Sequence, residues 1–252
     1  MTDNSSYLAA VPAYNERETI GAVVAALHEH APQFDVVVID DGSTDDTARV
    51  AVAAGARVLR HPFNLGIGGA VQCGFSFARE NGYDYMVQVD ADGQHDPSEI
   101  AALARAMEAE PRLDMVCGSR FLEHAGYESP RGRRAGIHIF AFLLSRIVGQ
   151  RVTDPTSGFR LFNRHAIKLF ARDYPHDYPE VEAVLMVHFH RLRMREIPVR
   201  MFQRGGGVSS ISSGKSIYYM VKVLLAIGVG LARARPVIEA GDDAPVAAAH
   251  GI

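Results

Sequence analysis

The chain has 252 residues, of which 48% are hydrophobic, and this suffices for one large domain with a sizeable core. A net charge of -3 excludes a general electrostatic attraction to nucleic acid, so any phosphate binding must be local. The two cysteines, Cys73 and Cys117, lack metal-ligand or redox spacing, and we expect them to be reduced thiols of a cytoplasmic protein.

Strand and helix patterns alternate along the first half of the chain. Apolar runs predict strands at 7–11, 35–40, 56–59, 84–90 and 113–117. A one-sided apolar pattern predicts a helix around 20–27, and a capping sequence at 43–46 predicts another that ends near Gly55. Because apolar strands alternate with helices, we expect an α/β fold with a mostly parallel central sheet covered on both faces.

The second half of the chain is less regular. It has an apolar stretch at 137–148, a turn-rich segment at 154–160, a helix pattern at 180–191, a strand pattern at 194–201 and a glycine-rich loop at 203–210. We expect the folded domain to span residues 1–212 and an apolar helix to fill 213–235. Residues 236–252 are rich in alanine, glycine and aspartate, and we expect them to be disordered.

The expected helix at 213–235 has a narrow basic stripe of Lys215, Lys222 and Arg233 on an otherwise apolar surface. Such a helix can lie in a membrane interface, on a partner membrane protein or on the core of its own domain, and we expect membrane or partner contact. The N-terminus does not resemble a signal peptide, and no apolar run reaches the roughly 20 residues needed to span a bilayer. The sequence therefore predicts a peripheral protein on the cytoplasmic face of a membrane.

Two carboxylates, Asp90 and Asp92, stand at the end of the predicted strand at 84–90. Side chains at i and i+2 of a strand point the same way, so these two converge at the strand end. Their oxygens suit Mg²⁺ or Mn²⁺, which bind few protein carboxylates and keep positions for water and phosphate. The pattern indicates a metal that holds a diphosphate, although an Asp-Gly turn alone would also account for it.

Polar residues also follow the first two strands. Glu16 comes after the first strand, and Asp40 and Asp41 come at the end of the second, where a carboxylate can accept hydrogen bonds from a ribose or a base. Ligands of parallel sheets bind beyond the carboxyl ends of the strands, so these clusters predict one active site. The glycines at 66–69 match neither the dinucleotide fingerprint nor a P-loop. We expect them to let the backbone approach a ligand, or a helix approach the sheet.

The motifs occur in a characteristic order: Pro12-Ala13-Tyr14-Asn15-Glu16, Asp40-Asp41-Gly42-Ser43-Thr44-Asp45, Asn64-Leu65-Gly66-Ile67-Gly68-Gly69-Ala70, Asp90-Ala91-Asp92-Gly93-Gln94-His95, Gly118-Ser119-Arg120 and Asp154-Pro155-Thr156-Ser157-Gly158-Phe159-Arg160. This order resembles glycosyltransferase family 2 over nearly the whole chain, from residue 11 to about residue 210. Within that family it is most similar to the polyprenyl-phosphate glycosyltransferases, a group that includes dolichyl-phosphate mannose synthase.

The resemblance implies a GT-A fold, a nucleotide-diphosphate sugar donor, a divalent metal (Mg or Mn) and an inverting single displacement. It implies that donor binding involves Pro12, Tyr14, Glu16, Asp40, Asp41, Gly68, Asp90 and Ala91. It implies metal binding by Asp90, Asp92 and Gln94, and catalytic roles for Asp92, Arg204, Arg120 and Arg131. It implies that the acceptor phosphate meets Arg120, Arg131, Arg133 and Arg134.

The implied acceptor is a polyprenyl phosphate such as undecaprenyl phosphate. A phosphate monoester has its second pKa near ~6, so it is largely dianionic at neutral pH and can attack without a general base. The protein must then offset the charge on the leaving diphosphate, which a metal and an arginine can do. Ser209-Ser210 stands where mannose synthases tend to carry Ser-Lys, so the sugar stays open, as do the nucleobase, the lipid length and the oligomeric state.

Two alternatives remain open from the sequence. A hydroxyl acceptor on a glycan or a small molecule would need a general base, for which Asp96, Glu180 and Glu182 are candidates. The last two also suit the first turn of a helix, where acids are stabilised by the helix dipole. A non-catalytic nucleotide-sugar-binding module is the other alternative. The paired acids and Arg204 favour an enzyme, because a binding module has no leaving group to stabilise.

Overall fold

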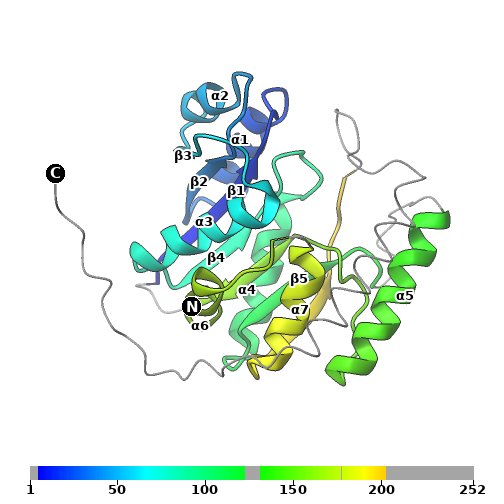
Figure 1. The fold of residues 1–252 in the computed structure, drawn as a ribbon. Coiled ribbons are helices and arrows are strands. Elements are labelled where there is room, and N and C mark those ends of the chain that lie inside the picture. Colours follow the sequence, from blue (N-terminus) through cyan, green and yellow to red (C-terminus); the bar gives the residue numbers. More distant parts are fainter. Residues whose placement is uncertain (1–4, 123–130, 177, 203–252) are drawn as a thin grey trace.

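The computed structural model describes residues 5–122, 131–176 and 178–202, and for residues 131–138 it describes the backbone only. Within these residues, seven strands form one sheet in the order β3-β2-β1-β4-β6-β5-β7. Figure 1 shows this sheet with helices packed around it. The strands are β1 Tyr7–Ala13, β2 Phe34–Asp40, β3 Arg57–Arg60, β4 Tyr85–Gln88, β5 Met115–Ser119, β6 Arg160–Asn163 and β7 Met194–Pro198. The helices are α1 Ile20–His30, α2 Thr47–Ala53, α3 Gly66–Glu80, the short 3-10 helix η1 Pro97–Glu99, α4 Ile100–Ala109, α5 Arg131–Val148, α6 Arg164–Arg172 and α7 Pro179–Phe189.

The sheet is mostly parallel, which confirms the expected fold class. Strands β1, β2, β3 and β4 pair in parallel, and so do β5 and β7. Only β6 among the described strands runs the other way, between β4 and β5, and pairs antiparallel with both. Because neighbouring parallel strands end at the same edge, the loops after β1, β2 and β4 meet there.

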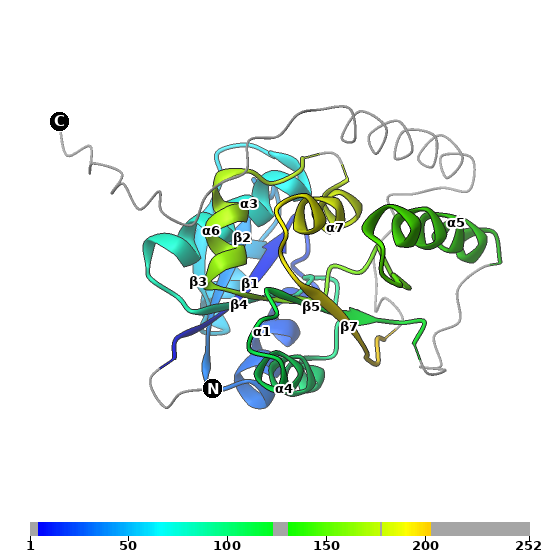
Figure 2. The same cartoon turned by 90° about the horizontal axis from the view of Figure 1, so that it is seen from below.

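Helices cover both faces of the sheet (Figure 2). On one face, Leu8 and Ala10 of β1 pack in a core with α3, α6 and α7. On the other face, Ala9 and Val11 pack with α1 and α4. This alternation follows from the two-residue period of a strand, and burial on both faces explains why β1 is apolar at every position.

The structure specifies elements that the sequence left undefined and shortens one expected strand. The glycine-rich segment at 66–70 is the start of helix α3, and the turn-rich segment at 154–160 leads directly into strand β6 and helix α6. The expected strand at 194–201 ends at Pro198, and Met201 forms an isolated bridge instead. The expected helix at 213–235, the tail at 236–252 and the domain end at residue 212 lie outside the described residues. In the parts of the chain that the structure describes, no helix combines the length and the hydrophobicity that crossing a bilayer requires.

Candidate active site

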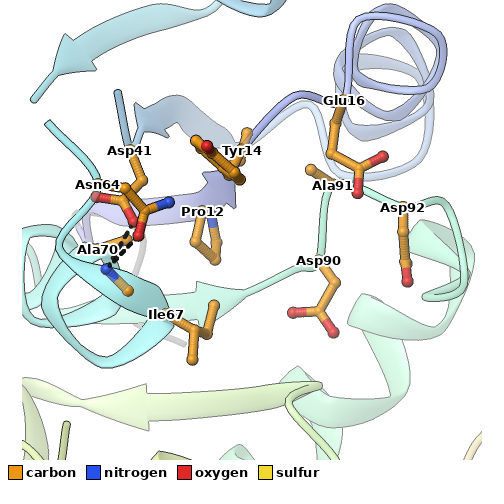
Figure 3. A pocket seen from close by; sticks show the side chains of 12 residues that line it. Pro12, Tyr14, Glu16, Asp41, Asn64, Ile67, Ala70, Asp90, Ala91 and Asp92 are labelled. Atoms are coloured by element: carbon orange, nitrogen blue, oxygen red, sulfur yellow. Dashed lines mark hydrogen bonds between the residues drawn. The ribbon is translucent and has the colours of Figure 1, made fainter. Parts of the chain in front are cut away.

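A cavity of about 350 Å³ lies at the carboxyl edge of the sheet, beyond strands β1, β2 and β4. The register brings these strand ends together, since Ala13 pairs with Asp40 and the N–H of Asp41 donates to the carbonyl of Ala13 at 2.9 Å. The cavity is lined by Pro12, Ala13, Tyr14, Glu16, Asp41, Asn64, Gly66, Ile67, Ala70, Asp90, Ala91 and Asp92 (Figure 3). All the predicted donor residues except Asp40 and Gly68 are therefore in this lining.

The loop that carries Tyr14 and Glu16 is fixed by the loop after β2. The backbone N–H of Asn15 donates to Ser43 Oγ at 2.9 Å, and that of Glu16 donates to Thr47 Oγ1 at 2.8 Å. In return, the N–H of Thr44 donates to Asn15 Oδ1 at 2.9 Å. Asn15 has φ 55°, a left-handed conformation that asparagine tolerates better than most residues. The two loops thus form one cross-linked wall of the cavity.

Asp41 joins the end of β2 to the start of α3. Its Oδ1 accepts from the N–H of Leu65 at 2.8 Å, and its Oδ2 accepts from the N–H of Gly66 at 2.9 Å. His61 Nδ1 lies 2.8 Å from Oδ1, and Asn64 Oδ1 also accepts from Gly66. Asp41 is buried, and it supplies the acceptors that the first N–H groups of a helix require. Its negative charge also lies at the positive end of the helix dipole.

Asp40 and Gly68 contact other parts of the protein instead of lining the cavity. Asp40 is fully buried, its Oδ1 accepts from the N–H of Ser43 at 3.0 Å, and its Oδ2 lies 3.2 Å from Arg60 Nε. A Cβ on Gly68 would lie 2.4 Å from the carbonyl oxygen of Pro175, so this glycine allows α3 to approach the loop before α7. Both residues support the walls of the site, and neither is in the lining.

Asp90 and Asp92 lie on the turn after β4, and both line the cavity. Gly93 has φ +75°, which reverses the chain, and the N–H of Gln94 donates to Asp92 Oδ1 at 3.0 Å. Figure 3 shows the carboxylates of Asp90, Asp92 and Glu16 at one end of the cavity, with Asp41 and Asn64 at the other end. Gln94, a predicted metal ligand, is not part of the described lining.

The charge of the cavity bears on what it can bind. Its described lining contains four acids, Glu16, Asp41, Asp90 and Asp92, and neither lysine nor arginine. An anionic diphosphate would be repelled here unless a cation accompanied it. Asp90 and Asp92 offer hard oxygen donors, which fit Mg²⁺ or Mn²⁺. Nowhere in the described residues do three His, Cys, Asp or Glu side chains come together to hold a metal.

Arg120 lies at the end of β5 and is buried in an ion pair. Its Nε and Nη2 both contact the carboxylate of Asp154, each at 2.7 Å, and Nη2 also donates to Thr156 at 2.8 Å. Asp154 is held in turn by Glu196, which accepts from the backbone N–H groups of Asp154 and Thr153. Burial raises the pKa of Glu196. The bidentate ion pair between Arg120 and Asp154 fixes the turn at 154–157 to the end of β5.

Comparison with known proteins decides the family. A family model described as "Glycosyl transferase family 2" matches residues 9–170. The chain belongs to glycosyl transferase family 2. It is therefore a glycosyltransferase, and this favours an enzyme over the non-catalytic alternative.

Curated relatives match this glycosyltransferase over most of its length. "Polyprenol monophosphomannose synthase" of Mycolicibacterium smegmatis is 30% identical and covers 92% of this chain and 91% of its own. "Undecaprenyl-phosphate mannosyltransferase" of Micrococcus luteus is 32% identical over 82% of this chain and 88% of its own. "UDP-N-acetylglucosamine--dolichyl-phosphate N-acetylglucosaminyltransferase" of Methanococcus voltae is 28% identical over 89% and 97%.

Solved structures share the fold. Glucosyl-3-phosphoglycerate synthase from Mycobacterium tuberculosis, in complex with Mn²⁺, UDP-glucose and phosphoglyceric acid, has a TM-score of 0.69 at 20% identity, covering 92% of this chain and 82% of that one. The same enzyme with Mg²⁺ and UDP has a TM-score of 0.66 at 19% identity, covering 92% and 81%. The glycosyltransferase therefore has a GT-A-type α/β fold.

The remaining predicted residues of the glycosyltransferase do not line the described cavity, and several of them have no described side chain. The first turn of α5 begins at Arg131, and the side chains of Arg131, Arg133 and Arg134 are not described, while Arg204 lies outside the described residues altogether. Glu180 and Glu182 are in the first turn of α7. Burial raises the pKa of Glu180. Asn64 and Ile67 line the cavity without having been predicted to, although Asn64 opens a motif that the sequence singles out.

Proposed function

We propose that this glycosyltransferase transfers a sugar from a nucleotide-diphosphate sugar to a polyprenyl phosphate, with inversion and with Mg²⁺ or Mn²⁺ at Asp90 and Asp92. The observation that carries the proposal is the acid-lined cavity at the carboxyl edge of the sheet, which needs a cation before it can accept a diphosphate. The names of two relatives, which contain a polyprenol or an undecaprenyl phosphate, support the acceptor class.

The donor would extend along the cavity. Its nucleoside would lie at the end of Asp41 and Asn64, beside the half-exposed ring of Tyr14, and its diphosphate would lie at Asp90 and Asp92. Asn64 has an amide and Asp41 a carboxylate, so the nucleobase would find both a hydrogen-bond donor and a hydrogen-bond acceptor. Gln94 would approach the metal only through a side-chain arrangement that brings it into the cavity.

The reaction needs no proton transfer from the protein. An oxygen of the lipid phosphate forms a bond to the anomeric carbon, while the bond from that carbon to the diphosphate oxygen breaks and its electron pair leaves with the nucleoside diphosphate. The metal would offset the charge on that leaving group. The protein's own residues hold the two anionic reactants in line and keep the diphosphate at one end of the cavity.

Arginines would offset the negative charges of the acceptor phosphate and of the leaving diphosphate. We assign the acceptor phosphate to Arg120, Arg131, Arg133 and Arg134, and the leaving diphosphate to Arg204. The first turn of α5 contains basic residues and no acid, which suits an anion at the positive end of that helix. Arg120 is already paired with Asp154, so it would contribute mainly by orienting the turn at 154–157 beside the acceptor. The segment 213–235 would hold the enzyme at the cytoplasmic face of the membrane, directly or through a partner.

The direct test incubates the protein with Mg²⁺ or Mn²⁺, a panel of UDP- and GDP-sugars and undecaprenyl phosphate, with mass spectrometry of the glycolipid. We expect product with one donor class, loss of product in EDTA and loss in Asp92→Asn. Asp46→Asn, which changes an exposed acid on the surface before α2, is the matched control and should keep activity. Failure with every donor, alongside transfer to a soluble hydroxyl acceptor, would overturn the acceptor class.

One observation favours a hydroxyl acceptor as the second candidate. Glu180 is a carboxylate whose pKa burial raises, with Arg160, Asp90 and Arg120 near enough to influence it. A raised pKa suits a general base. If one of these acids deprotonates a hydroxyl acceptor, its own variant, Glu180→Gln or Glu182→Gln, should lose turnover. If a phosphate dianion attacks, both variants should retain turnover.

A further inference from the structure

His95 closes the turn that carries Asp90 and Asp92. The residue is 5% exposed, and its Nδ1 accepts a hydrogen bond from the backbone N–H of Asp90 at 2.9 Å. A ring nitrogen that accepts carries no proton, so the neutral imidazole has its hydrogen on Nε2.

The second ring nitrogen lies beside the side chain of the same aspartate. Nε2 of His95 is 3.4 Å from Oδ2 of Asp90, so the N–H on this nitrogen lies next to a carboxylate oxygen. His95 therefore meets Asp90 twice, at its backbone and at its side chain. The first contact is a hydrogen bond that fixes the backbone of Asp90, and the second places the imidazole against one oxygen of its carboxylate.

The imidazole is itself held in place by two segments distant in the sequence, one at Phe159 and one at 201–202. Its ring stacks on the buried ring of Phe159, with centroids 4.8 Å apart and planes 17° apart. The backbone of His95 bridges Met201, and the N–H of Phe202 donates to the carbonyl of Gln94 at 2.8 Å. These contacts leave the imidazole little freedom to turn away from Asp90.

Gly158, which precedes Phe159 in the chain, lies directly against Asp90. A Cβ on Gly158 would lie 3.2 and 3.4 Å from the two carboxylate oxygens of Asp90 and 3.0 Å from Gln88 Nε2. Only a residue without a side chain fits here with no displacement of its neighbours. The adjacent pair Gly158 and Phe159 therefore contacts both the carboxylate and the imidazole, although neither residue offers a reactive group.

We propose that His95 is a positioning residue, which fixes the carboxylate of Asp90 in the orientation that a divalent cation requires, with Gly158 and Phe159 as its supports. The inference rests on the proposed metal site. A buried histidine can also serve the fold alone, so the proposal demands that metal affinity depends on the imidazole in a folded protein. Removing the outer contacts of metal ligands typically weakens metal binding about 10- to 100-fold.

The test measures Mn²⁺ binding to the full-length protein by electron paramagnetic resonance, with and without UDP or GDP, and needs no turnover. His95→Phe keeps a planar ring for Phe159 and removes both nitrogens, so we expect Mn²⁺ to bind about 10- to 100-fold more weakly. His95→Asn keeps an acceptor near the place of Nδ1, and its affinity should lie between those of the wild type and His95→Phe. In kinetics, the Mn²⁺ concentration for half-maximal rate should rise while kcat recovers at saturating Mn²⁺.

Two further variants complete the design. His165→Phe removes an imidazole that contacts Asp114, beside the amino end of β5, and should leave Mn²⁺ binding unchanged. Gly158→Ala keeps His95 but crowds Asp90, so it should weaken Mn²⁺ binding, and it replaces His95→Phe if that variant does not fold. Wild-type affinity in a folded His95→Phe, or in Gly158→Ala in its place, would overturn the positioning role. If the wild type binds no Mn²⁺, the proposed metal site itself fails.

Discussion

Replacing Asp41 by asparagine tests whether this cavity residue stabilises the protein before any ligand binds. The carboxylate of Asp41 accepts from the N–H groups of Leu65 and Gly66 at the start of α3 and contacts His61, the residue that follows β3. Asparagine keeps one oxygen, so one of these donors would face an amide NH₂ group instead. We therefore expect Asp41→Asn to lower the free energy of unfolding even without nucleotide.

The magnitude follows from the contacts that are lost. A hydrogen bond to a charged group contributes about 1.5–3 kcal/mol, and a negative charge at a helix N-terminus contributes about 0.3–1 kcal/mol. Asn64 Oδ1 also accepts from Gly66 and softens the loss on that side. The expected decrease is about 2–4 kcal/mol, which is a large part of the roughly 5–15 kcal/mol that stabilises a typical domain.

Urea unfolding of the nucleotide-free protein, followed by circular dichroism, measures this decrease. Asp46→Asn is the matched control, because Asp46 is exposed and pairs only with Arg49 among the contacts described for it, so its midpoint should change little. The reasoning would be refuted if Asp41→Asn unfolded at the wild-type urea concentration and lost only its affinity for UDP or GDP. Asp41 would then be a ligand-binding group alone.

Three further predictions concern packing, a thiol and an ion pair. Gly68→Ala should destabilise the protein by about 1–3 kcal/mol in urea unfolding, because its Cβ would lie 2.4 Å from a backbone oxygen. Burial raises the pKa of Cys117 from 9.0 to about 12, so iodoacetamide at pH 8 should label half-buried Cys73 first and Cys117 only on unfolding, as peptide mass spectrometry would report. Arg120→Lys keeps the charge but loses the two-pronged contact with Asp154, and it should lower the free energy of unfolding by about 1–3 kcal/mol.

Each of these predictions has an outcome that would contradict it. Gly21→Ala is the control for Gly68, because its Cβ would meet only the side chain of Val50, at 3.1 Å, and an unchanged midpoint in Gly68→Ala would mean that the loop before α7 yields easily. Equal labelling rates of the two thiols in the native protein would mean that Cys117 is reached by local opening. Arg120→Lys with wild-type stability would show that the ion pair contributes no net stabilisation, as some buried pairs do.

The sequence predicted the first half of the fold well because its signals are local. Strands β1 and β2 are largely apolar and are followed at once by polar residues, and β4 is followed by Val89 and then by Asp90, so the strand ends and the edge at which the cavity lies were visible in the sequence. The distinction between neighbouring residues was not visible. Asp40 and Asp41 look equivalent in the sequence, yet Asp40 turns to Ser43 and Arg60, whereas Asp41 lines the cavity.

The elements that were not predicted depend on distant partners. Helix α3 begins with glycines, which disfavour a helix, and its first N–H groups are capped by Asp41, 24 and 25 residues earlier in the chain. Strand β6 has four residues and starts with Arg160, a charge that is 1% exposed and donates to the carbonyl of Glu180. Neither a short strand nor a buried arginine can be read from periodicity, because tertiary contacts supply the stabilisation.

The antiparallel strand β6 has a consequence for how such enzymes can be recombined. Every described residue of the cavity lining lies between positions 12 and 92, whereas Arg120, Asp154 and the basic start of α5 come later. The two portions meet where β6 pairs with β4, with Met86 opposite Phe162 and Val87 opposite Leu161, and where α3 packs against α6 and α7. If the proposed donor and acceptor sites are correct, a chimera that joins the first portion of this chain to the second portion of another family member should keep its sugar-nucleotide preference and exchange its acceptor preference, provided that these packing surfaces are preserved.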